Sequence, residues 1–395
     1  MDRHQFGQMI ERRNTGAEKW DALGEVFGDK DLLPLWVADM DFAAPPAVAE
    51  AIASRAAHPI YGYHRRGDGY YEAATAWLEN RHGWKVAENW LVDTPGVVTA
   101  LSVAIQAFTR PGDKVLIQAP VYPRFFSCVT KNKRQLVINP LARGGNGYGI
   151  DFDHLEQELA AGVRLILLCS PHNPVGRVWT EQELMRLGET CLRFGALIVA
   201  DEIHADIVFK GHRHLPLASL SPELAASTVT CIAPSKTFNI AGLAASLTVI
   251  ADPGLRTRFN DITKALNICD GNIFGNIALE AAYRHGGPWL DSLLGYLEDN
   301  ADFLVRFFAR NIPGIKVEKP QGTYLAWLDC RALGIDPAEL NAYFVRQAKV
   351  GLSDGARFGR EGQGFMRLNF GCPRPLLQDG LERIAAAYSR LPPVF

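Results

Sequence analysis

Two short polar motifs in this sequence contain residue types that could do covalent chemistry. One is the segment 235–239, which contains Lys236, and the other is the segment 199–204, which contains Asp201. Each motif closes a short apolar run, so the lysine amine is expected to lose hydration and to have a lowered pKa, which makes it a usable nucleophile. A neighbouring aspartate can keep a pyridine nitrogen protonated. The pair therefore indicates a cofactor with an aldehyde and a pyridine ring.

Taken singly, each of these residues also has an ordinary structural explanation. A lysine after a strand is often a surface residue whose charged end reaches water, and an aspartate before a helix is often an N-cap. A third polar motif, at 170–174, contains Asn173 and follows another apolar run. Because ligands of open α/β sheets gather at the carboxyl ends of the strands, three polar motifs at that edge favour one shared site.

The elements that must position these motifs follow an α/β pattern. Alternating apolar and amphipathic runs between about 90 and 250 predict β-α units around a mostly parallel sheet. A helix is expected from Thr180 through Arg193, because Thr180 and Glu183 have the spacing of a capping box. The apolar runs expected to be strands are 114–118, 164–169, 196–200, 229–233 and 244–250.

The C-terminal third changes character and predicts a smaller α+β domain. It contains a helical pattern over 288–310, a second helix that opens at Asp336 with Pro337 in its first turn, and a closing helix after Pro375. The further expected strands are 315–318, 323–329 and 365–370. The expected domains are a large one over 45–285 and a small one that joins 1–44 to 286–395.

The composition excludes several classes of protein. With 41 basic and 43 acidic residues in 395, the net charge of -2 provides no positive field for nucleic acid or anionic membranes. No apolar run approaches the roughly 18 residues of a membrane span, and the N-terminus lacks a signal-peptide core. We therefore expect a cytoplasmic protein that binds neither nucleic acid nor membrane. The seven cysteines show no paired spacing, and no metal site is expected.

Two further motifs carry less weight. His212 and His214 could be combined with His204 and Asp206 into a metal site, but their spacing is not that of a ligand set, and an exposed loop is the expected arrangement. The segment 144–149 is rich in glycine but opens no helix after a strand. It therefore predicts a turn and not a dinucleotide-binding loop.

Longer motifs make the chain resemble a known family. They are LWVADMDF (35–42), YGY (61–63), TPGVV (94–98), PVYP (120–123), PHNPVG (171–176), DEIH (201–204), SKTFNIAGL (235–243) and RLNFGCP (367–373). The chain resembles fold type I pyridoxal-phosphate enzymes of the class I/II aminotransferase superfamily, and within it the MalY/PatB-type cystathionine β-lyases. The resemblance implies the PLP-dependent transferase fold, pyridoxal 5'-phosphate as cofactor, an amino-acid substrate and a homodimer with shared active sites.

The resemblance also implies roles for residues around the cofactor ring. Lys236 would form the Schiff base with the cofactor and then move the substrate α-proton. Asp201 would pair with the pyridinium nitrogen, and Asn173 would hydrogen-bond the ring hydroxyl. His204 stands where the aminotransferases have a tyrosine near the same hydroxyl, with a structural histidine as the alternative. Tyr122 would stack on the ring.

Further residues that match the family would bind the substrate and the phosphate. Arg367 would hold the substrate α-carboxylate in a bidentate pair, and Trp36 would either line the substrate pocket or be a buried tryptophan. Ala233 and Ala244 stand where aminotransferases often have a serine and an arginine on the phosphate, so phosphate binding must depend on other groups. The expected phosphate-binding residues are Gly96, Val97 and Val98 at a helix start, Ser235, and Tyr61 of the adjacent subunit.

The scaffold alone does not choose the reaction. The segment 36–42 and His204 favour the lyase subgroup, which predicts α,β-elimination from cystathionine or another S-substituted cysteine to a thiol, pyruvate and ammonia. An aminotransferase or amino-acid epimerase with the same residues is the alternative, and a non-catalytic regulatory protein that keeps the cofactor is a third hypothesis. The family-like segment starts by Arg12, so we expect no DNA-binding head in front of it.

Overall fold

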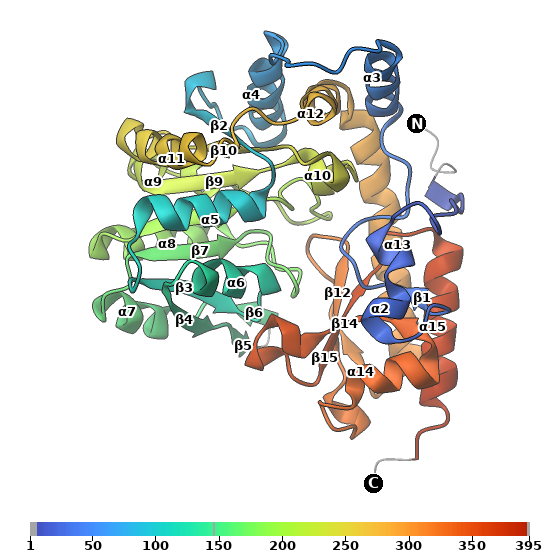
Figure 1. Cartoon of the computed structure of the whole chain (residues 1–395). Coiled ribbons are helices and arrows are strands. Elements are labelled where there is room, and N and C mark those ends of the chain that lie inside the picture. The colour runs from blue at the N-terminus through green and yellow to red at the C-terminus, as the bar shows by residue number, and fades with distance from the viewer. Residues whose placement is uncertain (1–5, 145–146, 393–395) are drawn as a thin grey trace.

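A mostly parallel sheet forms the centre of the larger part of the molecule (Figure 1). The computed structural model describes residues 6–144 and 147–392, and within them this sheet has seven strands. In spatial order they are β2 (Leu91–Thr94), β10 (Ser246–Val249), β9 (Thr228–Ile232), β8 (Leu197–Asp201), β7 (Leu165–Cys169), β3 (Lys114–Ala119) and β4 (Gln135–Pro140). The pairs from β9 to β4 are parallel, whereas β10 is antiparallel to both of its neighbours.

Helices cover both faces of this sheet, which explains its continuous apolar strands. In β7, Leu165 and Leu167 pack into the cluster on one face, and Ile166 and Leu168 pack into the cluster on the other. Side chains alternate between the faces of a strand, so a strand buried on both faces is apolar throughout. One face carries α5 (Val97–Phe108), α6 (Pro123–Lys131) and α11 (Pro253–Ala265), and the other carries α7 (Phe152–Ala160), α8 (Glu181–Phe194) and α9 (Pro222–Ser227).

The remaining elements build the β2 end of the large sheet and a second, smaller sheet. Helices α3 (Pro46–Ala57) and α4 (Gly69–His82) both pack against α12 (Ile273–His285), at the top of the molecule in Figure 1. In the described part of the chain the smaller sheet has four antiparallel strands, with α13 (Gly287–Asn311) and α15 (Arg374–Tyr388) packed against it. These strands are β11 (Lys316–Val317), β12 (Leu325–Asp329), β15 (Phe365–Asn369) and β14 (Ser353–Asp354).

Short elements complete the chain. The N-terminal helices α1 (Glu18–Asp21) and α2 (Leu23–Phe27) precede β1 (Leu33–Pro34), which pairs in parallel with β13 (Val350–Gly351). β5 (Ala142–Gly144) and β6 (Gly147–Gly149) form a hairpin, and the centre of the turn predicted at 144–149 lies outside the described residues. The remaining short helices are α10 (Pro234–Thr237) and α14 (Leu340–Tyr343).

Most elements predicted from the sequence are confirmed, within a few residues at their ends. The capping box is confirmed, since Thr180 Oγ1 accepts from Glu183 N and Glu183 Oε2 accepts from Thr180 N. The helix predicted to open at Asp336 is wrong in its start. Asp336 instead closes a turn by accepting from the amide of Ala338, and α14 begins only at Leu340.

Two strands of the large sheet, β2 and β4, were not predicted from the sequence. β2 is only four residues long and mixes Leu91 and Val92 with two polar residues, and β4 ends in a proline at the edge of the sheet. The large sheet falls within 45–285, and the four-stranded sheet falls within 286–395. The domain boundaries themselves stay a prediction.

Candidate active site

The parallel register brings the three polar motifs to one edge of the sheet. Cys169 at the end of β7 pairs with Asp201 at the end of β8, and Asp201 pairs in turn with Cys231 of β9. The chain leaves each strand just beyond this row. Asn173 therefore follows β7 and Lys236 follows β9, on either side of Asp201. The expected edge of the sheet holds all three residues.

Lys236 lies in α10 and points its amine at the N-terminal segment. Its Nζ donates to the carbonyl oxygen of Ala38 over 2.6 Å. Burial lowers the pKa of Lys236 to about 8; the charge of Asp39 opposes this shift, and the charge of Arg367 adds to it. At pH 7, one unit below this pKa, roughly a tenth of the molecules therefore have the neutral amine that a nucleophile or a general base requires.

Asp201 is a buried carboxylate with little local compensation. It is 6% exposed, and its Oδ1 accepts from the amide of Ile203 over 3.2 Å. Burial raises the pKa of Asp201 to about 7, against the lowering effects of that hydrogen bond and of the Lys236 charge. A buried acid whose charged form is this costly is stabilised by a cationic hydrogen-bond donor placed against it.

Arg367 lies in β15 of the smaller sheet and reaches across to the end of β7. Its Nη1 donates to Asn173 Oδ1 over 3.1 Å, and its Nη2 donates to the carbonyl oxygen of Trp36 over 2.9 Å and to Ser353 Oγ over 3.1 Å. The buried Nε has no partner among the described residues. Burial lowers the pKa of Arg367 to about 10, so the side chain is a fixed cation with a free donor. This geometry suits a carboxylate ligand.

Two aromatic side chains and a histidine complete the wall around these groups. His204 is 3% exposed, and its Nδ1 has no partner among the described residues. Burial, together with the charges of Lys236 and Arg367, lowers the pKa of His204 to about 3, so the imidazole is neutral. Its ring lies edge-on to that of Tyr324, 5.9 Å away. Tyr122 precedes α6, and its amide donates to the carbonyl oxygen of Asn173 over 3.1 Å.

The helix start predicted to bind an anion follows β2. Gly96 is the N-cap of α5, so the amides of Val97 and Val98 belong to the first turn and have no acceptor within the helix. Ser235 is the second residue of α10, next to Lys236, and is half-buried. Ala244 ends a short turn with a φ of 49°, and its methyl group is too short to replace the arginine that aminotransferases often have at this position.

Two predicted site residues lie elsewhere within this chain. Tyr61 is 56% exposed, and its hydroxyl donates to the carbonyl oxygen of Ala56. The indole of Trp36 is buried beside Phe27, with ring centroids 5.3 Å apart, and donates to the carbonyl oxygen of Lys19. Of the two alternatives for Trp36, the structure therefore has the buried tryptophan, and its contribution to the site is the carbonyl oxygen that accepts from Arg367.

The segment 36–42 contributes backbone carbonyl oxygens to the site, which the sequence did not indicate. Ala38 O accepts from both Lys236 Nζ and Tyr324 Oη. Asn369 Nδ2 donates to the carbonyl oxygens of Val37 and Asp39 over 2.5 and 2.6 Å. Tyr324, Ser353 and Asn369 are the residues that sequence reasoning missed, and only Asn369 lies inside a motif that could have indicated it.

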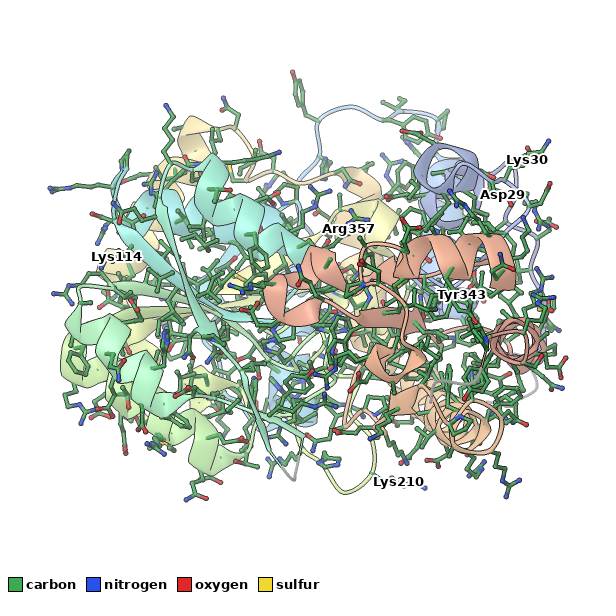
Figure 2. The ribbon with its side chains drawn as sticks, turned by 90° about the horizontal axis from the view of Figure 1, so that it is seen from below. Asp29, Lys30, Lys114, Lys210, Tyr343 and Arg357 are labelled. Carbon is green, nitrogen blue, oxygen red and sulfur yellow. The ribbon has the colours of Figure 1, made fainter. Side chains whose placement is uncertain are left out.

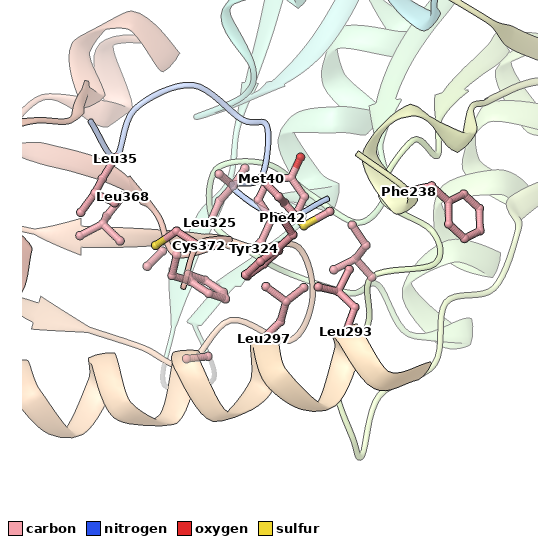
Figure 3. Close-up of a cluster of buried hydrophobic side chains, with 14 of the residues drawn as sticks. Leu35, Met40, Phe42, Phe238, Leu293, Leu297, Tyr324, Leu325, Leu368 and Cys372 are labelled. Atoms are coloured by element: carbon pink, nitrogen blue, oxygen red, sulfur yellow. The ribbon is translucent and has the colours of Figure 1, made fainter. Parts of the chain in front are cut away.

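Side-chain anchors fix this segment from both ends. Asn239 accepts from the amide of Met40 and donates to the carbonyl oxygens of Met40 and Phe42. The Met40 and Phe42 side chains pack with Tyr324 and α13 (Figure 3). On the outer side, Asp41 forms ion pairs with the fully buried Lys19 and with Arg12. The carbonyl oxygens that face Lys236 and Arg367 are therefore held in place.

The histidines considered for a metal site are arranged differently. Within the described residues no group of three or more His, Cys, Asp or Glu side chains could hold a metal ion. His214 is buried and paired with Glu202, so the expectation of an exposed loop is wrong at this residue. Among these same residues, no helix is both long and apolar enough to cross a membrane.

Comparisons with known proteins assign this chain to a family. The model for aminotransferase class I and II matches residues 30–384. The chain belongs to the class I and II aminotransferase family. It is 48% identical to cystathionine β-lyase PatB of Bacillus subtilis over 385 residues, which cover 97% of this chain and all of PatB. It is 34% identical to protein MalY of Escherichia coli, over 97% of this chain and 98% of MalY.

Solved structures agree with this placement. Cystalysin from Treponema denticola, which contains pyridoxal 5'-phosphate, matches with a TM-score of 0.95 and 35% identity over 98% of this chain and 99% of that one. The PLP-bound C-S lyase from Staphylococcus hominis matches with a TM-score of 0.91 and 33% identity over 97% of both chains. The fold of this family member is the fold of these enzymes, as its motifs predicted.

Proposed function

We propose that the protein is a PLP-dependent carbon–sulfur lyase that cleaves cystathionine or another S-substituted cysteine by α,β-elimination. The observation that carries this proposal is the 48% identity to cystathionine β-lyase PatB over its whole length. An aspartate aminotransferase from Geobacillus stearothermophilus is only 28% identical over 73% of this chain. PatB and the relative from Corynebacterium glutamicum, which is 34% identical over 96% of this chain, are both named as cystathionine β-lyases.

The free polar groups of the site fit pyridoxal 5'-phosphate. Asp201 is a buried acid that needs a cationic donor, and a protonated pyridine nitrogen provides one. Asn173 gives its oxygen to Arg367, which leaves its Nδ2 to donate to the ring hydroxyl. The unpartnered Nδ1 of His204 lies in the same wall. The amides of Val97 and Val98, the hydroxyl of Ser235 and Tyr61 of the adjacent subunit would hold the phosphate.

The chain's own residues would carry the protons and the substrate. When bound, the cofactor supplies an electron-accepting ring that stabilises the negative charge left when the α-proton of the substrate is removed. Arg367 fixes the substrate α-carboxylate with its free Nε, a donor that lysine could not place in the same way. Lys236 would hold the cofactor aldehyde until the amino group of the substrate displaces it. The released neutral amine would then accept the α-proton and pass a proton to the departing sulfur.

We further propose that two copies of the chain share their sites. The loop after α3 exposes three large apolar side chains, with Ile60 at 67%, Tyr61 at 56% and Tyr63 fully exposed. Adjacent large exposed side chains of this kind are typical of an interface. In this arrangement Tyr61 of the partner subunit completes the phosphate site. The cytoplasmic location predicted from the sequence stays a prediction.

Pyruvate release is the direct test of the lyase function. Pure protein is incubated with cystathionine, pyridoxal 5'-phosphate and no keto acid, and pyruvate and free thiol are measured. We expect equal amounts of both, and Lys236→Ala should abolish them. Lys210→Ala is the matched control, because Lys210 lies on an exposed loop (Figure 2). Amino transfer that requires an added keto acid, without pyruvate release, would replace the lyase with the aminotransferase alternative.

A further inference from the structure

A buried hydrogen-bond network lies directly behind the lysine and the aspartate of the site. Asp206 is its centre and is 8% exposed. Its Oδ2 accepts from Thr237 Oγ1 over 2.7 Å, and its Oδ1 accepts from Trp77 Nε1 over 3.1 Å. His82 Nε2 lies 2.9 Å from the same Oδ1, so that nitrogen carries the hydrogen. Three donors from two helices therefore meet on one carboxylate.

The charge of Asp206 is stabilised by these contacts. The pKa of Asp206 stays below its usual range, because the hydrogen bond and charge of His82 and the hydrogen bond of Thr237 together outweigh the cost of burial. An ionised, fully paired carboxylate is a strong anchor, since hydrogen bonds to charged groups contribute more than neutral ones. Removing one donor would leave a buried charge with fewer partners.

A second histidine–carboxylate pair adjoins the first. His214 Nε2 lies 2.9 Å from Glu202 Oε2, and Glu202 Oε1 accepts from the amide of Leu217. The rings of His82 and His214 meet edge to face, 5.5 Å apart. The space between the pairs is a cavity of about 10 Å³, lined in part by His82, Glu202 and Asp206. It is too small for any ligand larger than water, so the network is not a binding site.

The network touches the chain immediately beside both reactive residues. Thr237 follows Lys236 in α10, a helix of only four residues, and Glu202 follows Asp201 at the end of β8. The ring of Phe238, the residue after Thr237 in the chain, also packs against that of Trp77, with ring centroids 5.5 Å apart. A single helical turn has little stability of its own, so its orientation depends on such tertiary contacts.

We propose that Asp206, with Thr237 and His82, positions Lys236 for catalysis, and that the Glu202–His214 pair does the same for Asp201. None of these five network residues contacts the reacting atoms; they act as positioning residues. The inference rests on the proposed function only in that Lys236 is the catalytic lysine. A metal site with His214 and Asp206 was not expected from their spacing, and this network now gives both residues a structural explanation.

Backbone hydrogen exchange of the cofactor-free protein tests the anchor without any reaction. Thr237→Val removes the donor and keeps the shape of the side chain. Amides around 234–240 should exchange roughly tenfold or more faster, since a hydrogen bond to a charged group contributes about that factor. Thr230→Val is the matched control, because Thr230 is buried in the preceding strand and its hydroxyl has no partner among the described residues. Equal exchange in the two variants would overturn the proposal.

Steady-state kinetics of the holoenzyme give a second, independent measurement. Thr237→Val should lower kcat roughly tenfold while KM changes less than twofold, because Arg367 still binds the substrate. Thr237→Ser should restore kcat, since it restores the hydroxyl. His82→Leu, which removes another donor to Asp206, should also lower kcat. A wild-type protein without lyase activity but with the predicted exchange difference would refute the proposed function and leave the positioning role standing.

Discussion

Lys236 shows how burial, as the largest of several effects, can prepare a side chain for chemistry. Desolvation lowers its pKa to about 8, and the nearby charges oppose each other: Asp39 raises the pKa, while Arg367 lowers it. The carbonyl oxygen of Ala38 accepts from the amine in both of its protonation states, so it orients the group without fixing the charge. The reactivity of the lysine therefore depends on its surroundings more than on any single partner.

This balance predicts how cofactor binding to the empty protein depends on pH. Only the neutral amine can attack an aldehyde, so the rate at which the visible band of the bound cofactor appears should rise with pH up to about 8 and then level off. Below that midpoint the rate should fall about tenfold per pH unit. The measurement is stopped-flow absorbance after mixing apoprotein with pyridoxal 5'-phosphate.

Asp39→Asn tests in which direction a nearby charge shifts the pKa of Lys236. The Asp39 carboxylate stabilises the ammonium form of Lys236, so its removal should lower the midpoint and speed cofactor binding at pH 7 roughly two- to tenfold. Asp31→Asn is the control, because Asp31 is an exposed carboxylate of the same N-terminal region. A midpoint near 10.5 in the wild type would show that the lysine is an ordinary solvated one.

Among the elements, the segment 36–42 has an effect out of proportion to its length. It forms neither helix nor strand, yet its carbonyl oxygens accept from Lys236, Arg367 and Tyr324. A buried backbone carbonyl oxygen without a hydrogen bond is energetically costly. The side-chain amides of Asn239 and Asn369 donate to carbonyl oxygens of this segment and so remove that cost. The segment links the ends of the two sheets.

Asn239→Ala should release this segment. The change removes three hydrogen bonds to Met40 and Phe42, which should cost about 2–3 kcal/mol of folding free energy and lower Tm by roughly 2–4 °C in a chain of this length. KM should rise, because the Trp36 carbonyl oxygen that helps to hold Arg367 would move. Thermal unfolding and steady-state kinetics measure the two effects.

Asn267→Ala separates the loss of hydrogen bonds from backbone strain. Both asparagines have a left-handed backbone, with φ of 57° at Asn239 and 52° at Asn267, so alanine is equally disfavoured at both positions. Asn267 is exposed and lies far from the segment in sequence. A Tm loss as large at Asn267 as at Asn239 would contradict the anchoring role.

At the scale of the whole molecule, long regular elements and local motifs were predictable, and contacts between distant segments were not. The buried strands β7, β8 and β9 and the capped helix α8 follow from apolar runs and one capping box. β2 was missed because four residues give no period, and the antiparallel direction of β10 depends on pairing that no local pattern encodes. The reach of Arg367 to Asn173 joins residues 194 positions apart.

We predict that each active site contains Lys236 of one subunit and Tyr61 of the other. Mixed dimers of Lys236→Ala and Tyr61→Ala chains contain one site with both residues intact, so re-assembly from an equal mixture should recover about a quarter of the wild-type activity. Lys236→Ala mixed with Arg367→Ala is the control. Those two residues face one site within a single chain, so every mixed dimer carries a defect in each site and no activity should return. Equal recovery in both mixtures, or none in either, would place Tyr61 outside the partner's site and leave its exposure to be explained by a different contact.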